Sequence, residues 1–171
     1  NWRQPGSWNV PIEEMAEIID YAVMNGYTVA WGGDVSGDGF TRNGLAILAD
    51  IDKAPTAAGT DMDHWLGLSK NERQKKVDDL GVNVVEKTPS QQQRQEEYDN
   101  WTLTDDHGML IYGIAKDQTG RKYYMVKNSW GPAGEYKGTW YMSENFIVAK
   151  TMDYMVNKNA IPKHIRKKLG I

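Results

Sequence analysis

Apolar residues recur at helical spacing near the start of the chain and predict one amphipathic helix. The helix is expected to run from Val10 to Asn25, and Gly26 is a natural C-terminal stop after it. Asn9 is placed to cap the helix, with Pro11 in the first turn, where a missing N–H costs little. The positions that set the spacing are Ile12, Met15, Ala16, Ile19 and Ala22.

Short runs rich in β-branched and aromatic residues predict strands on both sides of a more polar stretch. The first runs from Tyr27 to Trp31, and the glycines at 32–33 are expected to end it. Later runs at Met109–Ala115 and Lys122–Lys127 are separated by a Gly-containing turn, which indicates a hairpin, and Gly138–Met142 supplies a third strand. We therefore expect three neighbouring antiparallel strands.

Polar and charged residues dominate the stretch from about Leu48 to Trp101, which we interpret as an inserted excursion. Such a composition buries little, so one or two short surface helices joined by loops are expected. One helix is predicted from Ser90 to about Tyr98, with Ser90 as its cap. A further short helix is predicted at Glu144–Lys150. The basic end at 163–168 is either a solvated terminal helix or a disordered tail.

Length and composition indicate one soluble globular domain. The 171 residues are 40% hydrophobic and 11% aromatic, and the net charge of −3 argues against nucleic acid or an anionic membrane as the main partner. No uninterrupted apolar run approaches the roughly 20 residues that a membrane span needs. The chain starts at Asn1 with no leader in view, so the sequence leaves the compartment open.

The segment between the first predicted strand and the polar stretch partly matches a calcium-binding loop, but one required ligand is missing. Asp34, Ser36, Asp38 and Gly39 fit the first, third, fifth and sixth positions of an EF-hand loop, but the twelfth is Leu45, where a bidentate Glu is needed. The glycines of this stretch are instead expected to be flexible loop residues: Gly37, Gly39 and Gly44.

No other metal or cofactor site is predicted. His64, His107 and His164 lack a partner ligand three or four residues later in the chain, no cysteine is present, and there is no Gly-Lys-Ser/Thr phosphate loop. The aromatic residues suggest a stacking surface for carbohydrate or single-stranded nucleic acid, but their positions on predicted strands favour a packed core. The residues concerned are Tyr123, Tyr124, Trp140 and Tyr141.

One pair of residues carries recognisable chemistry. His107 opens one predicted strand, and Asn128 follows its antiparallel neighbour, so their side chains can meet. An imidazole held by an amide oxygen is the base that a cysteine nucleophile requires, because a free thiol with a pKa of about 8.5 is mostly protonated at neutral pH. Trp130 could lie over the hydrogen bond and exclude water. The alternative is a strand-edge histidine and a turn asparagine with structural roles only.

The sequence motifs that contain His107 and Asn128 resemble those of a known protein family. Asp106-His107-Gly108-Met109, then Lys127-Asn128-Ser129-Trp130-Gly131, then Gly138-Thr139-Trp140-Tyr141, resemble the C-terminal half of papain-like cysteine peptidases. Asn9-Val10-Pro11 with Met15, and the Gly-x-Asp-Val run ending at Val35, are similar to the bleomycin hydrolase and aminopeptidase C branch. The resemblance implies an α+β fold, the antiparallel β-barrel-like right half of a papain-like protease, with residues 1–171 as its C-terminal part and an insertion at about 48–101.

The resemblance also implies roles for individual residues. His107 would be the base and acid, Asn128 the orienter, Trp130 a shield over their hydrogen bond, and Asp106 a residue lining the substrate cleft. The nucleophilic cysteine and an oxyanion-hole glutamine would lie upstream, since this chain has no cysteine. In this branch the C-terminus reaches into the cleft and restricts cleavage to the amino end of peptides, whereas the end of this chain is long and basic.

The function expected is therefore that of a cysteine peptidase part, an aminopeptidase by resemblance, that acts on peptides together with a cysteine-bearing upstream half. The resemblance implies no cofactor and no metal, a homo-hexamer for the whole protein, and a cytoplasmic location, with a periplasmic or secreted form as the alternative. The rival interpretation is a non-catalytic interaction domain or pseudo-peptidase that keeps the His107–Asn128 pair as structure. By itself the chain is expected to hydrolyse nothing.

Overall fold

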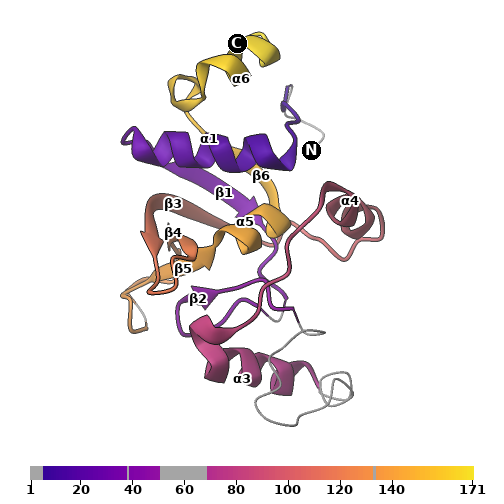
Figure 1. Cartoon of the computed structure of the whole chain (residues 1–171), viewed down its shortest axis with the longest axis vertical. Coiled ribbons are helices and arrows are strands. Elements are labelled where there is room, and N and C mark those ends of the chain that lie inside the picture. Colours follow the sequence, from indigo (N-terminus) through magenta and orange to yellow (C-terminus); the bar gives the residue numbers. More distant parts are fainter. Residues whose placement is uncertain (1–5, 38, 51–68, 133) are drawn as a thin grey trace.

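An open six-stranded sheet forms the centre of the protein in a computed structural model that describes residues 6–37, 39–50, 69–132 and 134–171 (Figure 1). The strand order is β2-β5-β4-β3-β1-β6. Neighbouring strands are antiparallel except β2 and β5, which are parallel. The strands are β1 (Val29–Gly33), β2 (Leu45–Ala46), β3 (His107–Lys116), β4 (Lys122–Lys127), β5 (Thr139–Ser143) and β6 (Thr151–Met155).

The predicted run of three antiparallel strands is confirmed as β3, β4 and β5. Their aromatic residues lie in the core, as expected: Tyr123, Tyr124 and Trp140 are at most 4% exposed, and Tyr141 is partly buried. Among the described residues the sheet does not close into a barrel. The half that the resemblance describes as barrel-like is an open sheet in this structure. Its edges are β2 and β6.

Helix α1 (Ile12–Met24) lies along one side of the sheet and buries its apolar face there (Figure 1). Ile19 of α1 and Phe146 of α5 (Glu144–Lys150) belong to the same core cluster as Trp31. The predicted bounds of α5 are confirmed, and the Ser143 hydroxyl caps it by accepting from the Phe146 N–H. Fully burying side chains of this size is worth about 1.5–3 kcal/mol each.

The predicted start of the first helix is wrong by two residues. The N-cap is Pro11, and no side-chain hydrogen bond caps the helix, so Asn9 does not take that role. Proline is suited to a helix start because its fixed φ suits the first turn and it has no N–H to satisfy. The Asn25-Gly26 end is as expected, with Gly26 at a φ of +80°.

The predicted end of the first strand is also wrong, because β1 includes both glycines. Gly32 and Gly33 pair with Gly108 and His107 of β3. A Cβ atom on Gly33 would lie 2.3 Å from the carbonyl oxygen of Lys150. Glycine therefore permits close packing within this strand and does not terminate it.

The described part of the polar stretch contains helix α3 (Lys70–Leu80), the 3₁₀ turn η2 (Gly81–Asn83) and helix α4 (Gln91–Asp99). Ser90 caps α4 by accepting from the Gln93 N–H, as predicted. The expectation of little burial holds for α4 but is wrong for Val77 and Val84, which are 1% and 4% exposed. They pack with core residues on the side of the sheet near β2. The assignment of this stretch as an insertion stays a prediction.

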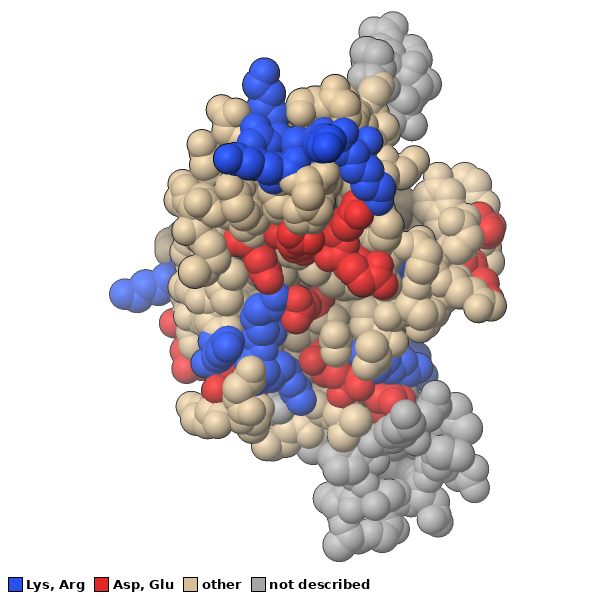
Figure 2. Space-filling view, turned by 45° about the horizontal axis from the view of Figure 1, so that its top comes forward, with Lys and Arg blue, Asp and Glu red and all other residues tan. Residues whose placement is uncertain are grey.

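The basic C-terminal end forms η3 (Lys158–Ala160) and helix α6 (Lys163–Leu169), which is the helical one of the two alternatives. Ile165 is fully buried and packs with Ile18 of α1. The Lys168 ammonium pairs with Glu14 at 2.7 Å. Figure 2 shows Lys and Arg side chains gathered at this end of the molecule, with Asp and Glu side chains next to them.

Across the described parts of the chain, no helix combines the length and the apolar character that crossing a membrane requires.

Candidate active site

The His107 and Asn128 side chains meet across the start of β3 and the end of β4. His107 Nε2 lies 2.9 Å from Asn128 Oδ1, which agrees with the distance of about 3 Å expected for a hydrogen bond. His107 is partly buried and Asn128 is 2% exposed. The contact predicted from the sequence is therefore present.

The antiparallel pairing of β3 and β4 explains why these residues meet although they are 21 positions apart. Strands that run in opposite directions place the start of one beside the end of the other. Leu110 pairs with Lys127, so Asn128 follows directly toward the start of β3. The Asn128 N–H donates to the carbonyl of Gly138 at 3.0 Å, which fixes the backbone that carries the amide.

The hydrogen bond fixes which ring nitrogen carries a proton. An amide oxygen only accepts, so His107 Nε2 must be the donor to Asn128 Oδ1. Within the described residues, Nδ1 of His107 has no hydrogen-bond partner. An imidazole held through Nε2 in this way leaves Nδ1 able to accept a proton from another group.

Trp130 packs beside the imidazole and is itself held by two other aromatic rings. Its ring centroid lies 5.1 Å from that of His107. It meets Phe40 and Trp140 edge-on, at 6.1 and 5.5 Å, and these two rings stack on each other at 5.7 Å. Trp130 is 53% exposed, and its role as a shield over the His107–Asn128 hydrogen bond stays a prediction. The supporting roles of Phe40 and Trp140 were not predicted from the sequence.

The loop that carries Phe40 is tightly packed at one glycine. The Ile47 N–H donates to the Gly39 carbonyl, and a Cβ atom on Gly39 would lie 2.0 Å from the Ile47 carbonyl oxygen. The expectation of a merely flexible glycine is therefore wrong at Gly39, because only glycine allows this approach. Phe40 then pairs with Ala46 and reaches the Trp130 ring. Asp38, a residue of the rejected calcium loop, lies outside the described residues.

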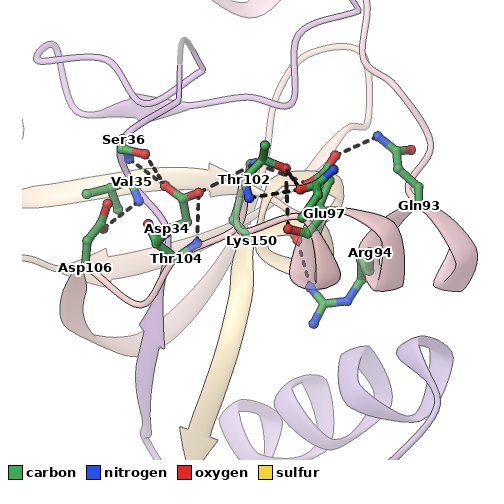
Figure 3. Close-up of polar contacts among 12 residues, drawn as sticks. Asp34, Val35, Ser36, Gln93, Arg94, Glu97, Thr102, Thr104, Asp106 and Lys150 are labelled. Carbon is green, nitrogen blue, oxygen red and sulfur yellow. Dashed lines mark hydrogen bonds and ion pairs between the residues drawn. The ribbon is translucent and has the colours of Figure 1, made fainter.

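Asp106 lies directly before His107 and is exposed, but one of its oxygens is occupied. Asp106 Oδ1 accepts the N–H of Val35 at 3.0 Å (Figure 3). The N–H of Asp106 donates to the Gly33 carbonyl. These two bonds join the end of β1 to the approach to β3. The role of Asp106 in lining a substrate cleft stays a prediction.

Comparison with known proteins assigns the family. A sequence profile of the peptidase C1-like family matches residues 4–170. The chain belongs to the peptidase C1-like family. It is thus related to cysteine peptidases, and the resemblance stated from the sequence motifs is confirmed.

Individual relatives of this peptidase C1-like chain are distant. Aminopeptidase C of Lactobacillus helveticus is 23% identical over 166 residues, which are 96% of this chain and 30% of that protein. Cathepsin L1 of Drosophila melanogaster is 48% identical over 33 residues, 19% of this chain and 9% of the relative. The crystal structure of PepW from Lactobacillus rhamnosis matches with a TM-score of 0.60 at 16% identity, covering 95% of this chain and 30% of that one.

The structural match confirms the predicted α+β fold class. The chain spans 30% of the length of both aminopeptidase C and PepW.

Two acidic residues near His107 were not predicted from the sequence. Asp153 of β6 pairs with Gly32, and a Cβ on Gly32 would lie 2.7 Å from Asp153 Oδ1 and 3.3 Å from Asp105 Oδ1. Partial burial, together with the carboxylates of Asp153 and Asp106, raises the pKa of Asp105. Asp105 and Asp153 lie far apart along the chain, so local sequence patterns do not reveal that their carboxylates are close.

In the described ranges, no group of three or more His, Asp and Glu side chains is arranged to hold a metal ion.

Proposed function

We propose that this chain is the base-bearing part of a cysteine peptidase, with His107 as general base and acid and Asn128 as its orienter. The observation that supports the proposal is the 2.9 Å contact between His107 Nε2 and Asn128 Oδ1, with Nδ1 left without a partner among the described residues. Membership of the peptidase C1-like family supports the same chemistry. The nucleophile is a cysteine, which this chain does not contain.

The proposed reaction proceeds through a thioester. The thiol, carried by an upstream part of the same protein, transfers its proton to His107 Nδ1, and the thiolate attacks the carbonyl carbon of the peptide bond. The C–N bond then breaks while His107 returns the proton to the leaving amine. Water, with its proton accepted by the same imidazole, cleaves the thioester and regenerates the thiol.

Asn128 and Trp130 would assist through position. The Asn128 amide keeps the imidazole in one orientation in both protonation states, because its oxygen accepts from Nε2 throughout. Trp130 reduces access of water to this hydrogen bond, which strengthens it. We further propose that Asp106 borders the peptide substrate, since it is exposed beside His107.

The finer proposal is an aminopeptidase. It is supported by the similarity along 96% of this chain to a protein named aminopeptidase C. The basic end of the chain does not contribute to this assignment, because α6 packs on α1 through Ile165 and Ile18. A homo-hexamer is proposed by family resemblance, and analytical ultracentrifugation of the full-length protein tests it. A sedimenting monomer would contradict the hexamer.

The test of the peptidase proposal is hydrolysis of aminoacyl fluorogenic substrates by the full-length protein that contains this chain. His107→Ala is expected to lower kcat/KM by about a hundred- to ten-thousandfold, because general acid–base catalysis contributes about 10² to 10⁴. Asn128→Ala is expected to lose less. His164→Ala is the matched control, since that side chain is 66% exposed and its ion-pair partner in the described part of the chain is Glu17 at 3.4 Å.

The outcomes separate the two candidate functions. Activity that is blocked by thiol reagents and lost in His107→Ala supports the peptidase. Equal activity in His107→Ala and the parent protein would refute the role of His107, and a full-length protein without turnover would favour the non-catalytic interaction domain. Residues 1–171 alone are expected to hydrolyse none of the substrates.

A further inference from the structure

A buried carboxylate lies at the end of β1, close to the segment that leads to His107. Asp34 is 1% exposed. Its Oδ1 accepts from the Ser36 N–H at 2.8 Å and from the Ser36 hydroxyl at 2.6 Å, and its Oδ2 accepts from the Thr104 N–H at 3.4 Å (Figure 3). One side chain therefore ties together two loops that are 70 residues apart in sequence.

These loops hold the approach to His107 through reciprocal contacts. The Asp106 N–H donates to the carbonyl of Gly33, and the Val35 N–H donates to the Asp106 carboxylate. Gly33 is also the residue that pairs with His107 in the sheet. Thr104 and Asp106, two of the three residues before His107, are thus attached by hydrogen bonds to the loop that Asp34 organises.

The charge of Asp34 is balanced from the far side by Lys150. The Lys150 ammonium lies 3.9 Å from Asp34 Oδ2 and 3.5 Å from Glu97 Oε2 of α4, and it is 15% exposed. The Asp34 N–H also donates to the Lys150 carbonyl. Burying a carboxylate is expensive unless it is paired and hydrogen-bonded, and here both oxygens have partners.

α4 is joined to the same network. The carbonyl of Glu97 accepts from the N–H groups of Thr102 and Leu103, both at 3.0 Å, where the chain turns from α4 toward His107 (Figure 3). The path from α4 to β3 is therefore held at one end by Glu97 and at the other by Asp34. Neither residue contacts the imidazole, so any effect on it passes through the backbone.

We propose that Asp34 is a positioning residue for His107: it fixes the backbone at Thr104–Asp106 and so sets the distance from the imidazole to Asn128. The proposal rests on the proposed role of His107 as the peptidase base. Catalytic groups need to be held to within about 0.5 Å, and a misplacement of about 1 Å can cost roughly a hundredfold in rate. The buried carboxylate of Asp34 meets this need for precise positioning, because it fixes the loop that leads to His107.

The first test measures the geometry without any activity. In ¹H–¹⁵N spectra of the chain labelled at histidine nitrogens, the His107 Nε2–H should give a cross peak, because its hydrogen bond to Asn128 slows exchange with water. Asp34→Asn keeps the shape but sets an NH₂ group against the Thr104 N–H. We expect this cross peak to shift or broaden beyond detection, as it should in Asn128→Ala.

Asp20→Asn is the matched control. Asp20 is also a carboxylate that accepts from another element, the Tyr124 hydroxyl at 2.7 Å, but it lies on α1. It should leave the His107 cross peak unchanged even if it lowers the melting temperature. If Asp34→Asn does not give a folded amide spectrum, Ser36→Ala removes a single hydroxyl from Asp34 at an exposed site and should shift the same peak in the same direction.

The second test is kinetic and uses the full-length protein. Asp34→Asn should lower kcat by about ten- to a hundredfold and change KM by less than about twofold, because the loss lies in the orientation of the base and not in substrate binding. An unchanged His107 cross peak with unchanged kcat would overturn the positioning role and leave the peptidase proposal standing. A parent protein without turnover would refute the peptidase proposal, while the cross-peak result would still decide the role of Asp34.

Discussion

Arg94 makes three of the hydrogen bonds that attach α4 to the rest of the fold, beside the ion pair of Glu97 with Lys150. α4 has no buried residues, yet Arg94 reaches from it to the junction of α5 and β6. Its Nη1 donates to the carbonyls of Val148 and Ala149, and its Nη2 donates to that of Thr151, all at 2.7 Å. Replacing Arg94 by Met keeps most of the aliphatic stem and removes the three hydrogen bonds.

The expected magnitude follows from these contacts. A hydrogen bond from a charged donor contributes about 1.5–3 kcal/mol net. The three bonds share one guanidinium, and burial lowers the pKa of Arg94, so its desolvation offsets part of the gain. The carbonyls regain water when α4 detaches. We therefore expect a loss of about 3 kcal/mol for the docked state of α4, which corresponds to a roughly hundredfold larger opening constant at about 1.4 kcal/mol per factor of ten.

Hydrogen exchange followed by mass spectrometry measures this opening directly. Peptides that cover α4 should exchange roughly a hundredfold faster in Arg94→Met, whereas peptides from β3 and β4 should change little. Gln95→Ala is the control on the same helix, since the side-chain partner of Gln95 among the described residues is Asp99, one turn away. Exchange in α4 that matches the Gln95→Ala control would refute the reasoning, because α4 would then be held by contacts other than Arg94.

Two further predictions concern the core around the site. Gly39→Ala should lower the free energy of unfolding by about 3 kcal/mol or more, because the new Cβ would lie 2.0 Å from the Ile47 carbonyl oxygen. Gly37→Ala is the control and should change the free energy of unfolding by less than about 0.5 kcal/mol, because its Cβ would lie 3.9 Å from Cε of Lys150. Equal melting temperatures for the two variants would contradict this prediction. Burial raises the pKa of Glu86 above its ordinary 4.5, although the Ser143 hydroxyl bonds to it. A raised folded-state pKa favours the folded protein below the unfolded pKa, and this contribution is lost as the pH rises through the folded pKa. Glu86→Gln should therefore gain stability relative to the parent as the pH rises above the ordinary pKa of 4.5 in urea titrations, and a constant or falling difference would contradict the argument.

The sequence by itself determined the features that depend on neighbours along the chain. The bounds of α5, the Ser90 cap of α4 and the strands of the β3–β4 hairpin all follow from periodicity, capping residues and turn residues within a few positions. The contact of His107 with Asn128 could also be predicted, because an antiparallel hairpin brings the start of one strand beside the end of the next.

Only the tertiary structure decided the features that depend on atoms from distant segments. Gly32 and Gly33 look like strand breakers, but Asp153 of β6 and the end of α5 at Lys150 approach them too closely for a Cβ, and both glycines pair within β1. Phe40 stacks on Trp140, a residue 100 positions later, and thereby supports Trp130. In the sequence, Asp34 belongs to an incomplete match to a calcium-binding loop. In the folded protein, the Thr104 N–H and the Lys150 ammonium lie beside its carboxylate. Local pattern cannot encode such contacts, because burial and close approach are set by the packing of the whole sheet and its helices.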